Sequence, residues 1–171
     1  MRGESGHLIA VTGVPSSGKS TVSRALESRS ATFSYFDGDQ FIRDHPPPLP
    51  LTAAGIAQTF ASTLDALAER MASANVILDV TLPAAYVKRT KERFGASVML
   101  VSLRVDEDEW RRRENQRPDR PPLEGWGTET SALQGPEELY DLAIDTTHKV
   151  TEAIVEEVLS EAQQFWDDLS V

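Results

Sequence analysis

Short apolar runs alternate along this chain with longer segments of helical periodicity. Apolar runs at 8–12, 31–36, 76–79, 97–103 and 139–144 have the length of strands. The segments between them favour helices at about 19–27, 84–94 and 106–115, with further helices beginning near 52 and covering about 149–169. Strands that alternate with helices pair in parallel. The pattern therefore predicts an α/β fold, a five-stranded parallel sheet with helices on both faces.

Two of these helices carry an apolar stripe on one side. Thr52 has the side chain of an N-cap, and the residues that follow it at helical spacing are Ile56, Phe60, Leu64, Leu67 and Met71. The last helix repeats the spacing with Val150, Ile154, Val158, Ala162, Phe165 and Leu169. The segment 45–50 is rich in proline and is predicted to be a loop, because proline cannot continue a helix.

Length and composition fit one domain over residues 1–171. The chain has no Cys, which excludes disulfides and Cys-ligated zinc. No apolar run has the length of a membrane span, and the first residues lack the apolar stretch of a signal peptide, so we expect a cytoplasmic protein. The net charge of -10 opposes attraction to nucleic acids and anionic membranes, and we expect neither as a partner. The oligomeric state stays open.

A phosphate-binding motif follows the first predicted strand. Residues 13–20 read G-V-P-S-S-G-K-S and satisfy G-x-x-x-x-G-K-[ST]. The glycines let backbone amides point at phosphates, the lysine reaches the β- and γ-phosphates, and the serine hydroxyl can ligate magnesium. A glycine turn with a coincidental lysine is the alternative, which the preceding strand and following helix disfavour. The expected nucleotide contacts are Gly13, Pro15, Ser16, Ser17, Gly18, Lys19, Ser20 and Thr21.

Acidic residues end two of the predicted strands. Asp79 follows an apolar run and suits the carboxylate that, with Ser20, organises a magnesium ion beside the phosphates; capping of the next helix is the alternative. Asp37 and Asp39 follow the second run, at the sheet edge where ligands bind in open α/β folds. Asp39 is the candidate base for an acceptor hydroxyl, and Asp37 a positioning group on the substrate side. A simple Asp-Gly turn is the alternative.

Arginines gather where the helix at 106–115 ends. Arg113, Arg117 and Arg120 are placed to cover the phosphates and neutralise developing charge, whereas Arg111 and Arg112 suit surface positions. The stretch 116–136 is rich in Pro, Gly, Arg and Glu and predicts a mobile loop, so we expect a lid at about 111–136. A solvated helix end paired to the acidic residues that begin this helix is the alternative.

Several segments together resemble the chloramphenicol phosphotransferase-like family of P-loop small-molecule kinases. They are 16–20 (S-S-G-K-S), 36–39 (F-D-G-D), 76–79 (V-I-L-D), 113–120 (R-E-N-Q-R-P-D-R), 140–141 (Y-D) and 145–149 (D-T-T-H-K). The segments span most of the chain in the family's order, and the arginine-rich and D-T-T-H-K segments are the more specific ones.

The resemblance implies a P-loop fold of the nucleotide-kinase type and an ATP- and Mg²⁺-dependent transfer of phosphate to a hydroxyl of a small molecule. Such kinases are best known from antibiotic inactivation. Asp39 falls on the family's proposed catalytic aspartate, with Lys19, Arg117 and Arg120 beside the transferred phosphate and Arg113 and Arg117 on the nucleotide. The chain departs from the family after Asp79 and in the proline-rich segment after Asp39, so the acceptor stays open.

Two other functions fit parts of the sequence. Asp37-Gly38-Asp39 with Arg43 also resembles the D-G-D-x-x-R of adenylylsulfate kinases, which extends the choice to an adenylylsulfate- or sugar-acid-type kinase. A nucleotide-dependent switch without an acceptor is the alternative from another class, and the acidic pair and the arginines argue against it.

Overall fold

Five parallel strands form one sheet in the order β2-β3-β1-β4-β5. The computed structural model describes residues 6–50, 52–118, 133 and 135–166. The strands are β1 (Leu8–Gly13), β2 (Phe33–Asp37), β3 (Asn75–Asp79), β4 (Val98–Arg104) and β5 (Leu142–Asp145). Every described pairing between neighbouring strands is parallel, so all of their carboxyl ends meet at one edge of the sheet.

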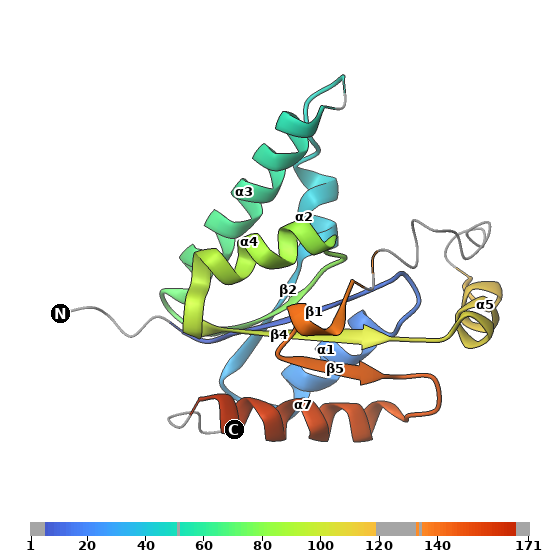
Figure 1. Cartoon of the computed structure of the whole chain (residues 1–171). Coiled ribbons are helices and arrows are strands. Elements are labelled where there is room, and N and C mark those ends of the chain that lie inside the picture. Colours follow the sequence, from blue (N-terminus) through green and yellow to red (C-terminus); the bar gives the residue numbers. More distant parts are fainter. Residues whose placement is uncertain (1–5, 51, 119–132, 134, 167–171) are drawn as a thin grey trace.

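Helices cover both faces of this sheet (Figure 1). They are α1 (Lys19–Arg29), α2 (Gly38–Asp44), α3 (Ala53–Met71), α4 (Ala84–Phe94), α5 (Glu107–Asn115) and α7 (Thr151–Phe165), with short 3₁₀ turns at Gly95–Ser97 and Glu137–Leu139. Helices α1 and α7 lie on one face and α3 and α4 on the other. Among the described helices, none is both long and apolar enough to cross a membrane.

The side chains of β1 show how the two faces divide. Ile9 and Val11 pack into the core under α1 and α7, whereas Leu8 and Ala10 pack into the core under α3 and α4. All six residues of β1 are buried, which is why this strand reads as a continuous apolar run and not as an alternating one. The five-stranded parallel sheet with helices on both faces is thus confirmed.

Two elements differ from the sequence prediction. The sequence pattern predicts no helix between Asp37 and the proline-rich segment, but residues Gly38–Asp44 fold as α2, because the Asp37 carboxylate caps the helix by accepting the Gln40 N–H at 2.7 Å. The last strand begins at Leu142, three residues later than predicted. Its expected first residue, Leu139, belongs to a 3₁₀ turn and packs into the α3–α4 core. The apolar residues at 139–140 serve packing and not strand pairing.

The Asp141 carboxylate joins α4 to two strands. It accepts hydrogen bonds from Lys91 Nζ at 2.7 and 2.8 Å and from the Leu100 N–H at 2.8 Å. Lys91 also donates to the Val98 carbonyl at 3.2 Å. These contacts attach α4 to the end of the sheet where β5 begins.

Replacing Asp141 with Ala is expected to lower the free energy of unfolding by about 2–3 kcal/mol, because the Leu100 N–H and the Lys91 ammonium lose their acceptor. Urea unfolding measures it. Asp65 provides the control: its pair with Arg93 leaves 71% of the Asp65 side chain exposed, so Asp65→Ala is expected to cost under about 0.5 kcal/mol. Equal effects of the two substitutions would contradict this role for Asp141.

Candidate functional site

The turn between β1 and α1 lies at the edge where the strands end. Gly13 ends β1 with φ 155°, and a Cβ at this position would lie 2.4 Å from the Leu103 carbonyl oxygen and 2.6 Å from Ser17 Oγ. Gly18 precedes α1 with φ 96°, in the left-handed region. Both positions require glycine, for close approach in the first case and for backbone conformation in the second. The turn leaves the N–H groups of the first turn of α1 free to receive an anion.

A cavity of about 840 Å³ opens in front of this turn. It is lined by Pro15, Ser16, Ser17, Gly18, Lys19, Ser20, Thr21, Val22, Asp37, Asp39, Arg43, Thr81, Arg113, Arg117, Thr146, Lys149, Thr151 and Ile154. Most of the residues predicted from the sequence therefore meet in one place. Gly13 and Asp79 lie behind the lining, and Arg120 lies outside the described residues.

Lys19 reaches into the cavity from a buried position. Its side chain is 7% exposed, and Nζ donates to the Val14 carbonyl at 3.3 Å. Burial lowers the pKa of Lys19, and the negative charges of Asp39 and Asp79 oppose that shift. A poorly hydrated ammonium beside free amides is a strong partner for a phosphate oxygen.

Asp79 ends β3 next to the glycine-rich turn. It is 2% exposed and pairs in register with Val11 of β1 and Asp37 of β2. Tyr35 OH donates to Asp79 Oδ2 at 2.9 Å, whereas Oδ1 is buried with no hydrogen-bond partner among the described residues. Burial raises the pKa of Asp79, while the nearby Ser20 hydroxyl, Lys19 and Tyr35 lower it. Burial and the charge of Asp79 raise the pKa of Tyr35.

These groups suit a magnesium ion held against phosphates. Among the described residues, no cluster of three or more His, Cys, Asp or Glu side chains could hold a metal ion. Mg²⁺ needs no such cluster, because it keeps waters and takes one or two protein oxygens together with phosphate oxygens. The Ser20 hydroxyl and the unpartnered Asp79 Oδ1 are oxygens of the required kind.

Asp39 is fixed in the first turn of α2. Its Oδ1 accepts the Thr81 N–H at 3.0 Å and its Oδ2 accepts the Thr81 hydroxyl at 3.3 Å. Thr81 follows Asp79 by two residues, so the loop after β3 holds the carboxylate in place. Asp37 has a different task, because its side chain caps α2. Both carboxylates line the cavity, and Asp39 has its geometry set from two elements.

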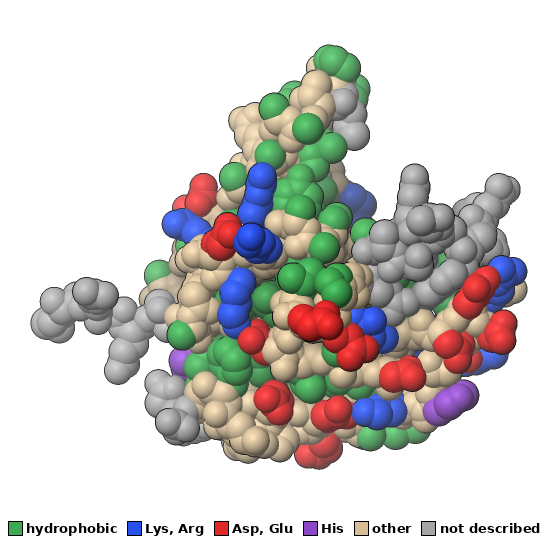
Figure 2. All heavy atoms as spheres, viewed as in Figure 1, with side chains coloured by type: hydrophobic (Ala, Val, Ile, Leu, Met, Phe, Trp, Pro, Cys, Tyr) green, Lys and Arg blue, Asp and Glu red, His purple; other side chains and the backbone are tan. Residues whose placement is uncertain are grey.

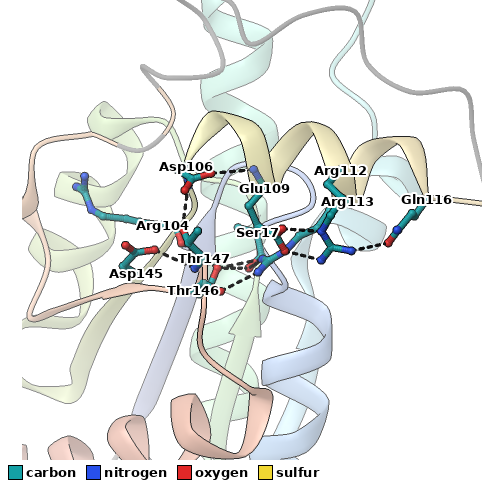
Figure 3. A network of polar contacts seen from close by, with 10 residues as sticks. All are labelled: Ser17, Arg104, Asp106, Glu109, Arg112, Arg113, Gln116, Asp145, Thr146 and Thr147. Carbon is teal, nitrogen blue, oxygen red and sulfur yellow. Dashed lines mark hydrogen bonds and ion pairs between the residues drawn. The ribbon is translucent and has the colours of Figure 1, made fainter.

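Arg113 joins α5 to the glycine-rich turn and to the loop after β5 (Figure 3). Its guanidinium donates to Glu109 Oε1 at 2.7 Å, to the Thr146 carbonyl at 2.7 Å and to the Ser17 carbonyl at 3.3 Å. Hydrogen bonds from Arg112 and Arg113 lower the pKa of Glu109 to about 2. Arg117 also reaches the turn, with NH1 3.5 Å from Ser16 Oγ. The surface role expected of Arg112 fits its 56% exposed side chain.

Thr146, in the D-T-T-H-K segment, connects the end of β5 to the same turn. Its hydroxyl lies 2.8 Å from the Arg104 carbonyl and 3.2 Å from the Ser17 carbonyl, and it is 1% exposed. Thr147 caps this corner by donating its N–H to Asp145 at 2.9 Å and accepting the Asp106 N–H at 3.1 Å. These contacts give the segment a structural role at the wall of the cavity.

Four residues of the site were missed by sequence reasoning. Tyr35 and Thr81 hold the two carboxylates, and Trp110 and Glu114 of α5 touch the glycine-rich turn. Their partners lie 42 to 98 residues away along the chain. Only strand register and helix docking, which no local pattern encodes, could have identified them.

Solved structures of two kinases and of an antibiotic resistance protein share this fold over nearly the whole chain. A gluconokinase from Sinorhizobium meliloti 1021 is 24% identical, with a TM-score of 0.64 over 98% of this chain and 97% of its own. A tunicamycin resistance protein from Deinococcus radiodurans is 20% identical, with a TM-score of 0.70 over 92% and 95%. A shikimate kinase from Acinetobacter baumannii is 19% identical, with a TM-score of 0.67 over 98% and 97%. At these identities the likeness shows the fold alone.

No curated protein matches the sequence. The model of one family, described as chloramphenicol phosphotransferase-like protein, matches residues 6–163. This range includes the glycine-rich turn, the ends of β2 and β3 that carry Asp37 and Asp79, and the arginines of α5. The chain belongs to the chloramphenicol phosphotransferase-like family.

Proposed function

We propose that the protein transfers the γ-phosphate of ATP to a hydroxyl group of a small molecule. The observation that carries the proposal is that the phosphate cradle with Lys19 and the fixed carboxylate of Asp39 line the same cavity. Membership of a family of small-molecule phosphotransferases supports the reaction class. The cytoplasm, where ATP is abundant, is the setting we infer for this activity.

The donor half of the site binds and orients the triphosphate. The backbone N–H groups of the turn at 13–20 and the Lys19 ammonium hold the β- and γ-phosphates; Pro15, which has no N–H, and Thr21 are further contacts that line the cavity. Ser20 and Asp79 would hold Mg²⁺, which supplies charge neutralisation between the phosphates. Arg113 approaches from α5 and Arg117 from just after its end, and we include Arg120 with them from the sequence alone. Their positive charge is suited to stabilise the phosphoryl group in transit.

The acceptor half of the site begins at Asp39. An acceptor hydroxyl that hydrogen-bonds to this carboxylate is oriented toward the γ-phosphate, and Asp39 takes its proton as the new O–P bond forms. The phosphate leaves ADP, whose terminal oxygens stay in the amide cradle. The two hydrogen bonds from Thr81 keep the carboxylate in one rotamer, so the geometry is set before the acceptor arrives.

Replacing Asp39 with Asn is expected to lower kcat about 10²- to 10⁴-fold, because the base is lost while the side-chain shape is kept. ATP affinity should change less than about threefold, since the cradle is untouched. Mass spectrometry of a metabolite and antibiotic panel incubated with MgATP identifies an acceptor for the assay. Asp44→Asn, at the other end of α2, is the matched control. Full transfer by Asp39→Asn would refute the assignment of the base.

Replacing Tyr35 with Phe removes the hydrogen bond that fixes Asp79 and is expected to raise the Mg²⁺ concentration for half-maximal ATP binding about three- to tenfold. Calorimetric titration of ATP at graded Mg²⁺ measures it without an acceptor. Tyr86→Phe is the control, because Tyr86 packs its ring on Phe60 against the core under α3 and α4. An unchanged Mg²⁺ requirement in Tyr35→Phe would show that Asp79 needs no such support.

An anionic acceptor, as in adenylylsulfate- or sugar-acid-type kinases, is the second candidate for the substrate. Arg43 lines the cavity one helical turn after Asp39, and its guanidinium donates to Gln40 Oε1 at 2.9 and 3.2 Å. Within the described residues, no carboxylate forms an ion pair with Arg43. A carboxylate, sulfate or phosphate on the acceptor would complete this site.

Replacing Arg43 with Gln separates the two classes of acceptor. If the acceptor is anionic, kcat/KM is expected to fall about 10- to 100-fold, as for loss of a charge-assisted hydrogen bond. A neutral acceptor such as chloramphenicol should be affected less than about threefold. Gluconate, shikimate, adenylylsulfate and chloramphenicol with MgATP form the test panel. A switch without any acceptor predicts slow hydrolysis and no phosphorylated product from a wider panel.

A further inference from the structure

Helix α5 holds three consecutive residues of the glycine-rich turn. Trp110 Nε1 donates to the Pro15 carbonyl at 2.9 Å, Ser16 Oγ donates to Glu114 Oε1 at 2.5 Å, and Arg113 donates to the Ser17 carbonyl at 3.3 Å. Residues 110, 113 and 114 lie on one face of the helix, as the helical spacing requires. This face of α5 is therefore a binding surface for the backbone and side chain of the turn.

Ser16 has an unfavourable backbone conformation. Its φ is 61°, and within the described residues it is the one non-glycine residue with positive φ. An L-residue with a Cβ avoids this left-handed region, whereas glycine enters it freely. A strained residue in a ligand-binding turn persists only where its surroundings hold it. Two groups reach the Ser16 hydroxyl, the Glu114 carboxylate of α5 at 2.5 Å and NH1 of Arg117, just after the end of α5, at 3.5 Å.

Glu114 is 1% exposed and does not line the cavity. A buried carboxylate is costly unless it accepts strong hydrogen bonds. A negative charge behind a phosphate site also opposes nucleotide binding in general. The Ser16 hydroxyl is among the partners of Glu114, and holding this strained residue accounts for a carboxylate at this position.

We propose that Glu114 is a positioning residue that keeps Ser16 in the left-handed conformation and so gives the turn its phosphate-binding shape. The inference rests on nucleotide binding at residues 13–20, as in the proposed function. It makes the phosphate cradle depend on the docking of the helix that carries Arg113 and is followed by Arg117. The nucleotide site and the arginines are then assembled as one unit.

A comparison of four variants tests the proposal through the conformation of residue 16. Ser16→Ala removes the hydroxyl and keeps the Cβ, whereas Ser16→Gly removes both and relieves the strain. Glu114→Met removes the acceptor at nearly constant volume, and it is combined with Ser16→Gly to complete the cycle. Dissociation constants for MgATP and urea unfolding are measured for each. Glu107→Gln, on the exposed side of α5 where it pairs with Arg111, is the control.

Ser16→Ala and Glu114→Met are each expected to weaken MgATP binding about five- to tenfold, and Ser16→Gly is expected to weaken it less than Ser16→Ala does. In the Ser16→Gly protein, adding Glu114→Met should weaken MgATP binding by a further factor of less than about two. This rescue is specific, because a role of Glu114 in general packing would cost the same in both backgrounds. The cycle in urea should show coupling of the same sign.

Equal losses for Ser16→Ala and Ser16→Gly would overturn the proposal, and so would additive losses in the cycle. If Glu114→Met does not fold, Glu114→Gln carries the same cycle with a smaller expected loss, because its amide oxygen still accepts a neutral hydrogen bond. If the parent protein binds no MgATP, the proposed function fails. The coupling in urea then still decides whether Glu114 supports Ser16, so the two failures are distinguishable.

Discussion

The parallel register of three central strands sets the geometry of the whole site. Val11 of β1, Asp79 of β3 and Asp37 of β2 are neighbours across the sheet, so the glycine-rich turn and two carboxylates emerge side by side. A slip of one residue in β3 would turn Asp79 to the opposite face. The apolar residues of these strands, packed between helices on both faces, make such a slip costly. Packing of the core thus positions the glycine-rich turn and the two carboxylates.

Opposite charges inside this frame depend on one another. Burial alone would favour a neutral lysine and a protonated aspartate, and it shifts the pKa of Lys19 down and that of Asp79 up. The negative charge of Asp79 opposes the fall in the pKa of Lys19, and the Lys19 ammonium opposes the rise in the pKa of Asp79. The negative charge of Asp39 also opposes the fall for Lys19. Acidic and basic side chains are spread over the outer surface shown in Figure 2. The net charge of -10 belongs to the whole chain, whereas the cavity brings together cationic side chains from α1, α2 and α5.

Much of this arrangement could be predicted from the sequence, because the informative features are local. The glycine-rich turn is contiguous, and the strands before Asp37 and Asp79 are short apolar runs. Helix α2 was missed because its N-cap, Asp37, looked like part of a turn. The contacts of Tyr35, Thr81 and Glu114 could not be predicted from the sequence, since each depends on strand register or helix docking between distant segments. Local sequence patterns indicate the candidate reacting groups, whereas the residues that hold these groups in place are known only from the tertiary packing.

The two halves of the cavity are built with different rigidity. The donor side is tied to β1, α5 and the loop after β5 through the carbonyls of Pro15 and Ser17, so its amides have little freedom. The acceptor side begins on α2, which has seven residues and is followed at once by the proline-rich segment. Within the described residues, Asp39 is the residue of α2 whose side chain is hydrogen-bonded from outside the helix, through Thr81. Under the proposed function, a fixed donor site beside a short acceptor element would let the residues after Asp39 change with the acceptor while the phosphate cradle stays undisturbed.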